Sequence, residues 1–487
     1  MEDKKFGKSV RKLNVIKHLI GLVRDDNKKI QLIEELARTI AYRTRGIYAD
    51  EYLEKMLCKI GSKIEVDLED SPRKGTVLHV LTQAGIMGGH TRVVDHWIQL
   101  DSVRKHSVVI TSGAAARKIF PQFLKDTIEE SGGNLYFLRS TGHISRARQL
   151  LEIAQRYDKI VLHTYMEDSI PALAFSNKKW RRTVYFFNHA NFRFWLGTSI
   201  TDVCLDITSQ DAVVSKELRG IKNIQILPVP MLADDQLLSV EAGDLRQRYG
   251  IEGRNKVVTT MANCYKYQTI SHYNFFDFLD RLLHRNKNII FFAIGPDKKE
   301  EEWERLCNKY PKRLRAMGIL DKDEVNEILK ITDLYVGSFP LGSGTACLDA
   351  AVMGVKVVSL KTDEPFFDSL RNRAETVEDL ITLIEGLLDG SIEYIPDDLQ
   401  AHLKEGWMRK LESIYNTSPP HRIYKCKSKN RFGKEEKILM CGLDKEEYRQ
   451  AWTWHGELPM FDLDEKEYVM PLEMSVWRHL FNKILWF

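Results

Sequence analysis

The chain has 487 residues, more than one hydrophobic core usually supports, so we expect two main domains. Its hydrophobic fraction of 43% and aromatic fraction of 10% exclude a largely disordered chain. The 72 basic and 68 acidic residues give a formal net charge of +4, too small to favour a nucleic-acid partner.

The seven cysteines are scattered and never spaced as Cys-x-x-Cys, which predicts neither a disulfide framework nor a zinc ribbon and favours a reducing compartment. The apolar stretch 13–23 is interrupted by Lys17 and His18 and is not followed by small residues, so we expect no signal peptide. No apolar run reaches the ~18 residues that span a bilayer. We expect a cytoplasmic protein, and peripheral contact with the inner face of the membrane stays open.

The first half of the chain predicts a helical extension followed by an α/β domain. Residues 1–70 form the extension, with two or three amphipathic helices over 13–64, where apolar residues such as Ile33 and Leu36 recur at helical spacing. After a linker at 71–75, short apolar strands alternate with helices, a pattern typical of a parallel sheet, and we assign residues 71–235 to a Rossmann-like domain. The expected strands are 77–81, 108–111, 135–139, 160–163 and 184–188, with a helix over 91–100.

The same pattern restarts after a hinge at about 228–250, and we assign residues 236–390 to a second Rossmann-like domain. Its expected strands are 257–261, 289–295, 334–336 and 357–360. The fold class is therefore α/β, with two tandem Rossmann-like domains. Residues 391–487 are predicted to be an extension that packs on the core; its apolar stripe over 474–485 favours such packing over membrane contact.

The strongest functional signal is a Gly-rich loop between a strand and a helix. The strand 334–336 leads into Gly342, Ser343 and Gly344, and a helix is expected to begin near Thr345. Glycines let backbone N–H groups approach a phosphate, and a helix N-terminus adds unpaired donors. Asp349 follows one turn later, within reach of ribose hydroxyls. The alternative is an ordinary strand–helix turn with a surface Asp.

Residues 333–358 resemble the donor-binding segment of GT-B glycosyltransferases, and the resemblance extends over about 75–390. It implies that Lys266 opposes the donor diphosphate and takes part in catalysis, and that Gly295 ends a donor-site strand. Lys356 replaces the Pro that is usual in this family. The resemblance implies a donor site made by Lys266, Gly295, Gly342, Ser343, Gly344, Thr345 and Asp349.

The first domain matches the family in its loops. Gly88, Gly89, His90 and Arg92 resemble a Gly-Gly-x-x-Arg loop that lines the cleft between the two domains. His189 follows the strand 184–188, where open α/β sheets bind ligands, and the resemblance implies a catalytic role for it and a cleft position for His163. A histidine with a pKa near neutrality can accept a proton from an acceptor hydroxyl. The alternative for each is a structural histidine.

The resemblance implies transfer of a sugar from a nucleoside diphosphate sugar to a hydroxyl acceptor on a glycan, glycolipid or protein, with no metal or other cofactor. Asp462 and Asp464 have the spacing of a metal-binding pair but lie outside both α/β domains. Leu341 stands where the retaining branch has a Glu, which favours inverting chemistry like that of the O-GlcNAc-transferase-like branch and leaves the stereochemistry open. A nucleotide-sugar epimerase and a non-catalytic scaffold of the same fold are the alternatives.

Overall fold

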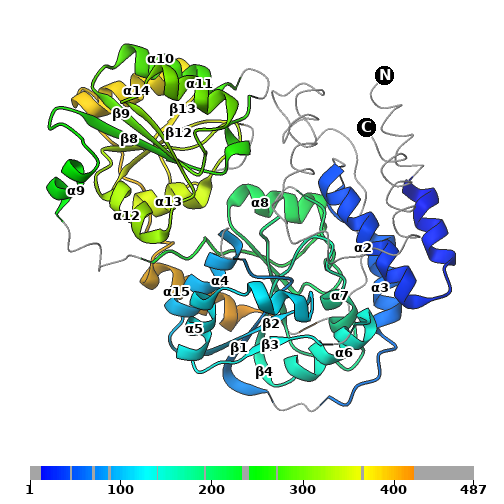
Figure 1. Cartoon of the computed structure of the whole chain (residues 1–487). Coiled ribbons are helices and arrows are strands. Elements are labelled where there is room, and N and C mark those ends of the chain that lie inside the picture. Colours follow the sequence, from blue (N-terminus) through cyan, green and yellow to red (C-terminus); the bar gives the residue numbers. More distant parts are fainter. Residues whose placement is uncertain are drawn as a thin grey trace. The chain divides into compact units, whose positions relative to one another are not determined.

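The structure is a computed structural model that describes residues 13–43, 47–68, 72–85, 89–139, 141–190, 193–232, 241–269, 273–362, 367–419 and 421. The chain forms two compact units that separate between Pro228 and Val229, and again within helix α15 (Lys404–Thr417), after Trp407. Each unit contains one parallel sheet with helices on both faces (Figure 1). The prediction of two tandem Rossmann-like domains is confirmed.

The first sheet has seven parallel strands in the order β3-β2-β1-β4-β5-β6-β7. The order steps outward from β1 in both directions, as in a Rossmann sheet, so the switch point lies between β1 and β4. The strands are β1 (Arg73–Leu81), β2 (Lys105–Ile110), β3 (Leu135–Phe137), β4 (Tyr157–His163), β5 (Val184–Phe187), β6 (Val203–Asp206) and β7 (Ile224–Ile226).

Successive side chains of each strand point to opposite faces of this sheet, and both faces carry apolar residues. Helices therefore pack on both faces and form two cores. Leu78 and Val80 contribute to one core, whereas Leu81 and Val108 contribute to the other. The first core includes α2 (Asp26–Arg43), α3 (Glu51–Gly61), α6 (His143–Ala154) and α7 (Ile170–Phe175), and the second includes α4 (Gly89–Leu100) and α5 (Gln122–Glu130).

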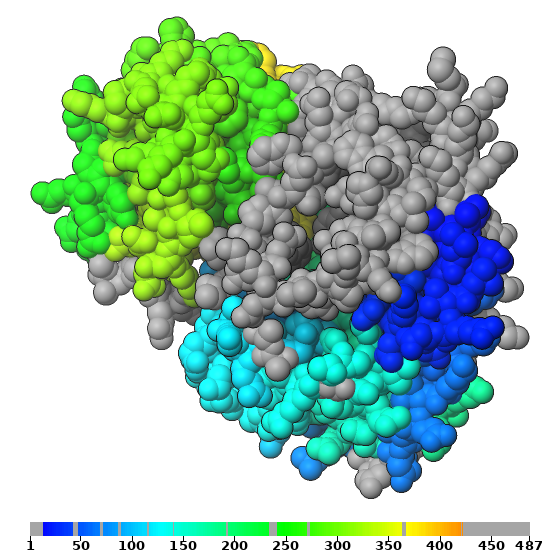
Figure 2. Space-filling view, turned by 45° about the vertical axis from the view of Figure 1, so that its right-hand side comes forward, coloured from blue at the N-terminus to red at the C-terminus, as the bar shows by residue number. Residues whose placement is uncertain are grey.

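The N-terminal helices are part of the first unit's own core. Residues 13–22 are also helical, and Ile16, Ile33 and Leu57 are buried in one cluster with Leu78 of β1. Figure 2 shows the N-terminal residues, in blue, packed against the cyan residues of this unit. Glu54 of α3 accepts hydrogen bonds from the backbone of 197 and 199, which joins the helices to the chain beyond β5.

The second sheet repeats the strand order with six parallel strands, β10-β9-β8-β11-β12-β13. These strands are β8 (Lys256–Met261), β9 (Ile289–Ile294), β10 (Leu314–Gly318), β11 (Leu334–Val336), β12 (Lys356–Leu360) and β13 (Arg373–Ala374). One face packs on α10 (Phe275–Arg285), α11 (Glu301–Lys309) and α14 (Val377–Asp389), and the other on α9 (Ala242–Arg248) and α12 (Lys322–Lys330) (Figure 1). Helix α13 (Gly344–Val352) follows β11.

Most differences from the sequence-based expectation concern short strands. Strands β6, β7, β10 and β13 were not predicted, and β10 contains Arg315, whose guanidinium lies over the ring of Phe292. A charged residue at the second position of a five-residue strand hides its apolar signal. The charged stretch 244–248, expected within a hinge, forms the end of helix α9. Residues 474–487 and the pair Asp462 and Asp464 lie outside the described residues.

We expect Gly61→Ala to destabilise the protein by about 1–3 kcal/mol, the usual cost of forcing extra volume into a packed contact. A Cβ at Gly61 would lie 2.1 Å from the backbone oxygen of Leu173, so α3 would have to move away from α7. Urea unfolding checks the change. Gly243→Ala is the control, because Gly243 is helical and has nothing within 4 Å of an added Cβ. Equal stability of the two variants would contradict close packing of α3 on α7.

Candidate functional site

In the second unit, the loop after β8 and the loop after β11 meet through Lys266. Residues Cys264–Tyr267 form a short 3-10 turn after β8, and it places the half-buried Lys266 beside the Gly-rich loop. The Nζ of Lys266 donates to the backbone oxygen of Gly342 at 2.6 Å, and the backbone N–H of Leu341 donates to the oxygen of Lys266 at 3.4 Å. The sequence-predicted cation and Gly-rich loop are therefore in direct contact.

The Gly-rich loop ends at the N-terminus of α13, one residue before the predicted start of the helix. An added Cβ at Gly344 would lie 2.4 Å from a ring carbon of Phe367, so that ring would have to shift to admit a larger residue. Ser343 is buried, whereas Thr345 and Asp349 are half-buried. The first N–H groups of a helix have no partner within it, so this terminus offers backbone donors beside an ammonium group. Asp349 follows on the next turn of the helix.

Gly295 brings the end of β9 against the same edge of the sheet. Its φ of 108° lies in the region that favours glycine, and an added Cβ would lie 2.1 Å from the backbone oxygen of Ala262. Ala262 precedes the turn that carries Lys266, so the close approach at Gly295 supports the position of that turn. The predicted donor-site residues thus come from three neighbouring loops of one sheet edge.

In the first unit, His90, His163 and His189 lie together. The ring of His90, at the start of α4, lies 4.0 Å from that of His189 between centroids, and Nδ1 of His163 lies 3.1 Å from Nε2 of His189. Gly89 is the first residue of α4, and Arg92 is half-buried on its next turn. Gly88 lies outside the described residues. Two of the predicted cleft residues, His90 and His163, therefore form one cluster with His189, which was predicted to be catalytic.

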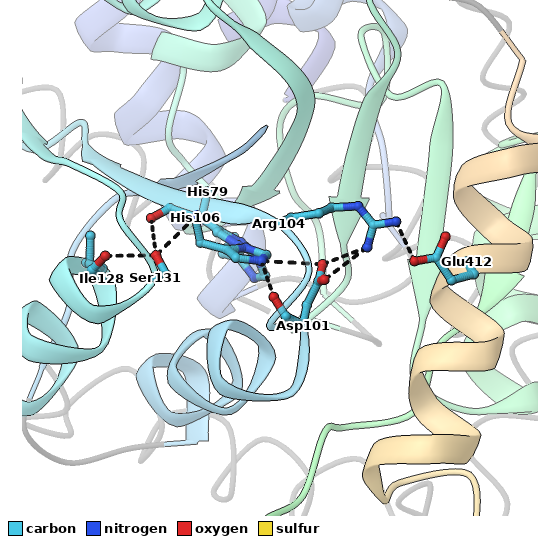
Figure 3. Close-up of polar contacts among 8 residues, drawn as sticks. His79, Asp101, Arg104, His106, Ile128, Ser131 and Glu412 are labelled. Atoms are coloured by element: carbon cyan, nitrogen blue, oxygen red, sulfur yellow. Dashed lines mark hydrogen bonds and ion pairs between the residues drawn. The ribbon is translucent and has the colours of Figure 1, made fainter. Parts of the chain in front are cut away.

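This cluster continues through two histidines that sequence reasoning did not propose for the site. Nε2 of His163 lies 3.1 Å from Nδ1 of His79 on β1, and Nε2 of His79 lies 3.0 Å from Nδ1 of His106 on β2. His106 ends the series at Asp101, whose backbone oxygen is 3.0 Å from its Nε2 (Figure 3). We call His106, His79, His163 and His189 the histidine row.

The register of the sheet explains why these four side chains meet. His106 pairs with Val77, so His79 lies two residues nearer the carboxyl edge, and His79 pairs with Val161, two residues before His163. Since side chains alternate between faces, steps of two keep every imidazole on one face, the face covered by α4. Trp97 of α4 packs edge-on against His79 and His163. The row therefore rises diagonally across β2, β1, β4 and the residues after β5.

Burial keeps His79, His90, His163 and His189 neutral. Desolvation lowers the pKa of His79, His163 and His189 well below the ordinary value, and neighbouring imidazoles lower it further. Burial lowers the pKa of His90 to about 4, although a hydrogen bond to the backbone of His163 acts in the opposite direction. The expectation of a pKa near neutrality was therefore wrong for His189 and His163. Their neutral rings each keep one nitrogen able to accept a proton.

The described residues were also searched for disulfides, metal-binding groups and membrane-spanning helices. Their cysteines, Cys58, Cys204, Cys264, Cys307 and Cys347, are free thiols. Among the described residues, no group of three or more His, Cys, Asp or Glu side chains is placed to hold a metal ion. A search of the same residues finds no helix with the length and apolar character needed to span a bilayer.

No family model and no curated protein matches the chain. Solved structures similar to it include a glycosyltransferase from Rickettsia africae (14% identity, TM-score 0.48, covering 71% of this chain and 95% of that one) and Anabaena HepE in complex with UDP and glucose (14%, 0.48, 70% and 98%). Another is the O-GlcNAc transferase of Thermobaculum terrenum (12%, 0.44, 87% and 77%). Because these TM-scores are below 0.5, the assignment of the fold rests on the two strand orders.

The neutral histidines should make the protein sensitive to acid. The pKa values of His79, His90, His163 and His189 are lowered in the folded state, so the unfolded chain binds more protons once the pH falls below about 6.5. We therefore expect the free energy of unfolding to fall from pH 6.5 toward pH 4, by up to about 1.4 kcal/mol per pH unit for each histidine.

Urea unfolding at pH 7.5, 6.5 and 5.5 measures this slope. His79→Gln should reduce the slope of the free energy of unfolding against pH by the contribution of one histidine. His284→Gln, on the exposed side of α10, is the control, because it removes a histidine without removing a buried ring. A free energy of unfolding that stays constant between pH 7.5 and 5.5 would contradict the neutral, buried state of these side chains.

Proposed function

We propose that this protein is a glycosyltransferase that moves a sugar from a nucleoside diphosphate sugar to a hydroxyl acceptor. The observation that carries the proposal is the contact between Lys266 and Gly342 at the N-terminus of α13. This places an ammonium group, unpaired backbone donors and a Gly-rich loop at one point, the combination that suits a diphosphate. Asp349, one turn into the same helix, is assigned to the ribose hydroxyls.

The proposed chemistry needs a base for the acceptor and stabilisation for the leaving group. His189 is assigned as the base, because it is neutral and follows the carboxyl end of β5, where open α/β sheets bind ligands. The acceptor oxygen attacks the anomeric carbon as His189 takes its proton, and the diphosphate leaves with the bonding electrons. Lys266 and the N–H groups of α13 stabilise the charge that develops on that diphosphate.

We further propose that transfer is metal-independent and inverting. A cation and a helix N-terminus already oppose the diphosphate charge, and Leu341 stands in the loop where a retaining enzyme of the resembled family has a carboxylate. His90 supports the acceptor side, since its Nε2 is buried without a hydrogen-bond partner among the described residues. A hydroxyl could donate to that nitrogen. A glycan, glycolipid or protein each offers such a hydroxyl.

The proposal is tested with donor binding and donor turnover. We expect one of UDP, GDP, ADP, CDP or dTDP to raise the melting temperature, because a ligand at ~100 times its Kd stabilises a protein by about 2.7 kcal/mol. Lys266→Met should lower that affinity roughly 10-fold or more while the unliganded melting temperature is retained. Lys287→Met, an exposed lysine of the same unit, is the control.

Turnover separates the alternatives. A transferase releases sugar and nucleoside diphosphate slowly from its donor when no acceptor is present, whereas an epimerase interconverts the sugar and a scaffold does neither. Binding of nucleoside diphosphate with equal affinity to the parent and to Lys266→Met would remove the main support for the donor site.

Asp349→Asn should weaken donor binding roughly 10- to 100-fold, because a hydrogen bond to a charged acceptor contributes about 1.5–3 kcal/mol. Calorimetry with the best-binding nucleoside diphosphate measures the loss, and the 2′,3′-dideoxy analogue should show a much smaller one. Glu393→Gln, at an exposed carboxylate of the same unit, is the control. Equal losses for both ligands would mean that Asp349 stabilises the loop or helix and does not bind the ribose.

A further inference from the structure

The histidine row has two different ends. His79, His106 and His163 are completely buried, whereas His189 is only half-buried, so a proton can reach the row at His189. At the other end His106 contacts both the backbone oxygen of Asp101 and, at 3.4 Å, its carboxylate. A diagonal of four hydrogen-bonded imidazoles thus connects the carboxyl edge of the sheet to a buried acid (Figure 3 shows the Asp101 end).

We propose that this row sets the tautomer of His189 and disperses the positive charge that His189 gains when it takes up a proton. His163, His79, His106 and Asp101 are positioning residues that act through His189 and do not touch the substrate. The proposal rests on the proposed function for the source of the proton, the acceptor hydroxyl. The tautomers and the charge transfer are properties of the free protein.

The tautomers follow from a single group that can only accept. A backbone carbonyl has no proton to give, so His106 must carry its proton on Nε2 in order to bond with Asp101. In the neutral form of His106 its Nδ1 is then bare and accepts from Nε2 of His79. The same polarity passes through His163 to His189, whose Nε2 donates and whose Nδ1 is left bare. His189 therefore offers Nδ1 as its basic nitrogen.

The Asp101 end can hold the charge. Arg104 donates to both carboxylate oxygens of Asp101, at 3.0 and 2.9 Å, and also to Glu412 of α15 (Figure 3). Two carboxylates and one guanidinium leave one net negative charge, which an imidazolium at His106 would balance. Burial opposes ionisation of Asp101, but His106 and Arg104 outweigh it, so the pKa of this acid is lowered and it stays charged.

Charge transfer requires three short proton shifts. When Nδ1 of His189 takes a proton, its Nε2 proton passes to Nδ1 of His163. The Nε2 proton of His163 then passes to His79, and that of His79 to His106, which becomes the imidazolium. His189, His163 and His79 each gain one proton and lose one, whereas His106 only gains one, so the positive charge ends on His106. Loss of the proton from His189 reverses the series.

Among the described residues, the rings that face His189 carry no charge that would oppose its own. Its ring faces His90 from α4, His163 from β4 and Phe187 at the end of β5, and His90 in turn faces Tyr165. His90 is neutral, with its pKa lowered to about 4 by burial, and burial raises the pKa of Tyr165 above its ordinary value. A protonated His189 without the row would therefore be a half-buried cation with no opposing charge among these described groups, which is costly.

His79→Gln separates charge transfer from hydrogen bonding. Glutamine keeps one donor and one acceptor, so it can preserve the polarity of the row, but it cannot carry a proton onward. We use the full chain with ¹⁵N-labelled histidine and long-range ¹H–¹⁵N correlation spectra, which show which ring nitrogen is protonated. At pH 7.5 we expect His79, His163 and His189 of the parent as Nε2–H tautomers, and His163 and His189 also in His79→Gln.

On acidification, His79→Gln should lower the apparent pKa of His189 by roughly one unit or more, the scale at which neighbouring sites titrate as a coupled set. Glu412→Gln, at the partly exposed end, should lower it in the same direction by less, and His284→Gln should leave it unchanged. In transfer assays the acid limb of kcat/KM should move to lower pH in His79→Gln, with lower kcat and unchanged KM for the donor.

An Nδ1–H tautomer at His163 or His189 in the parent overturns the assignment of tautomers. An identical titration of His189 in the parent and in a folded His79→Gln overturns charge transfer. The spectra use no donor or acceptor, so they test the row independently of sugar transfer. If the protein shows the expected tautomers and pKa shift but transfers no sugar, the proposal for the row stands and the proposed function fails. If the protein transfers sugar but the acid limb of kcat/KM is the same in the parent and in His79→Gln, the proposed function stands and the proposal for the row fails.

Discussion

All strands in both sheets run parallel, so the loops that follow them leave each sheet along one edge. Lys266, Gly295 and the Gly-rich loop follow β8, β9 and β11, which are neighbours in the second sheet. His189 likewise follows β5, beside His163 at the end of β4. Within each sheet, side chains separated by tens of residues are brought to the same edge because the strands run in one direction. An antiparallel sheet would have sent alternate loops to opposite edges.

The spacing of parallel strands also suits the histidine row. Neighbouring strands lie roughly 4.8 Å apart, and an imidazole on one strand can reach the next. The ring centroid of His79 lies 5.3 Å from that of His106 and 5.2 Å from that of His163, and the facing ring nitrogens lie at hydrogen-bond distance. Each ring satisfies the polar atoms of its neighbours, which offsets the cost of burying them. A single imidazole at β1 would have had no such partner.

The elements with long apolar runs could be predicted from the sequence, and so could the Gly-rich loop. Strands such as β9 consist of six buried residues, whereas β10 is interrupted by Arg315 and was missed. His79 and His106 were missed for a different reason. His79 stands alone among apolar residues and His106 lies between Lys105 and Ser107 at the start of β2, and their relation appears only when β2, β1, β4 and β5 are placed side by side. Sequence shows the period of two within a strand, but the pairing register belongs to the sheet. The contact between Lys266 and Gly342 likewise depends on strand order.

The proposed donor loops of the second sheet place a fixed positive charge, whereas the histidine row of the first sheet is kept neutral, and the difference has a physical reason. A diphosphate carries its charge in the ground state, so a fixed ammonium and helix dipole can be placed against it in advance. In the proposed function His189 is the base and must be neutral until it takes its proton, and burial lowers its pKa. Burial alone would also make the base weak, because its cation is desolvated. A carboxylate beside His189 would stabilise that cation but would hold the proton before the reaction. Placing Asp101 three hydrogen-bonded rings away keeps His189 neutral and still gives its charge a partner.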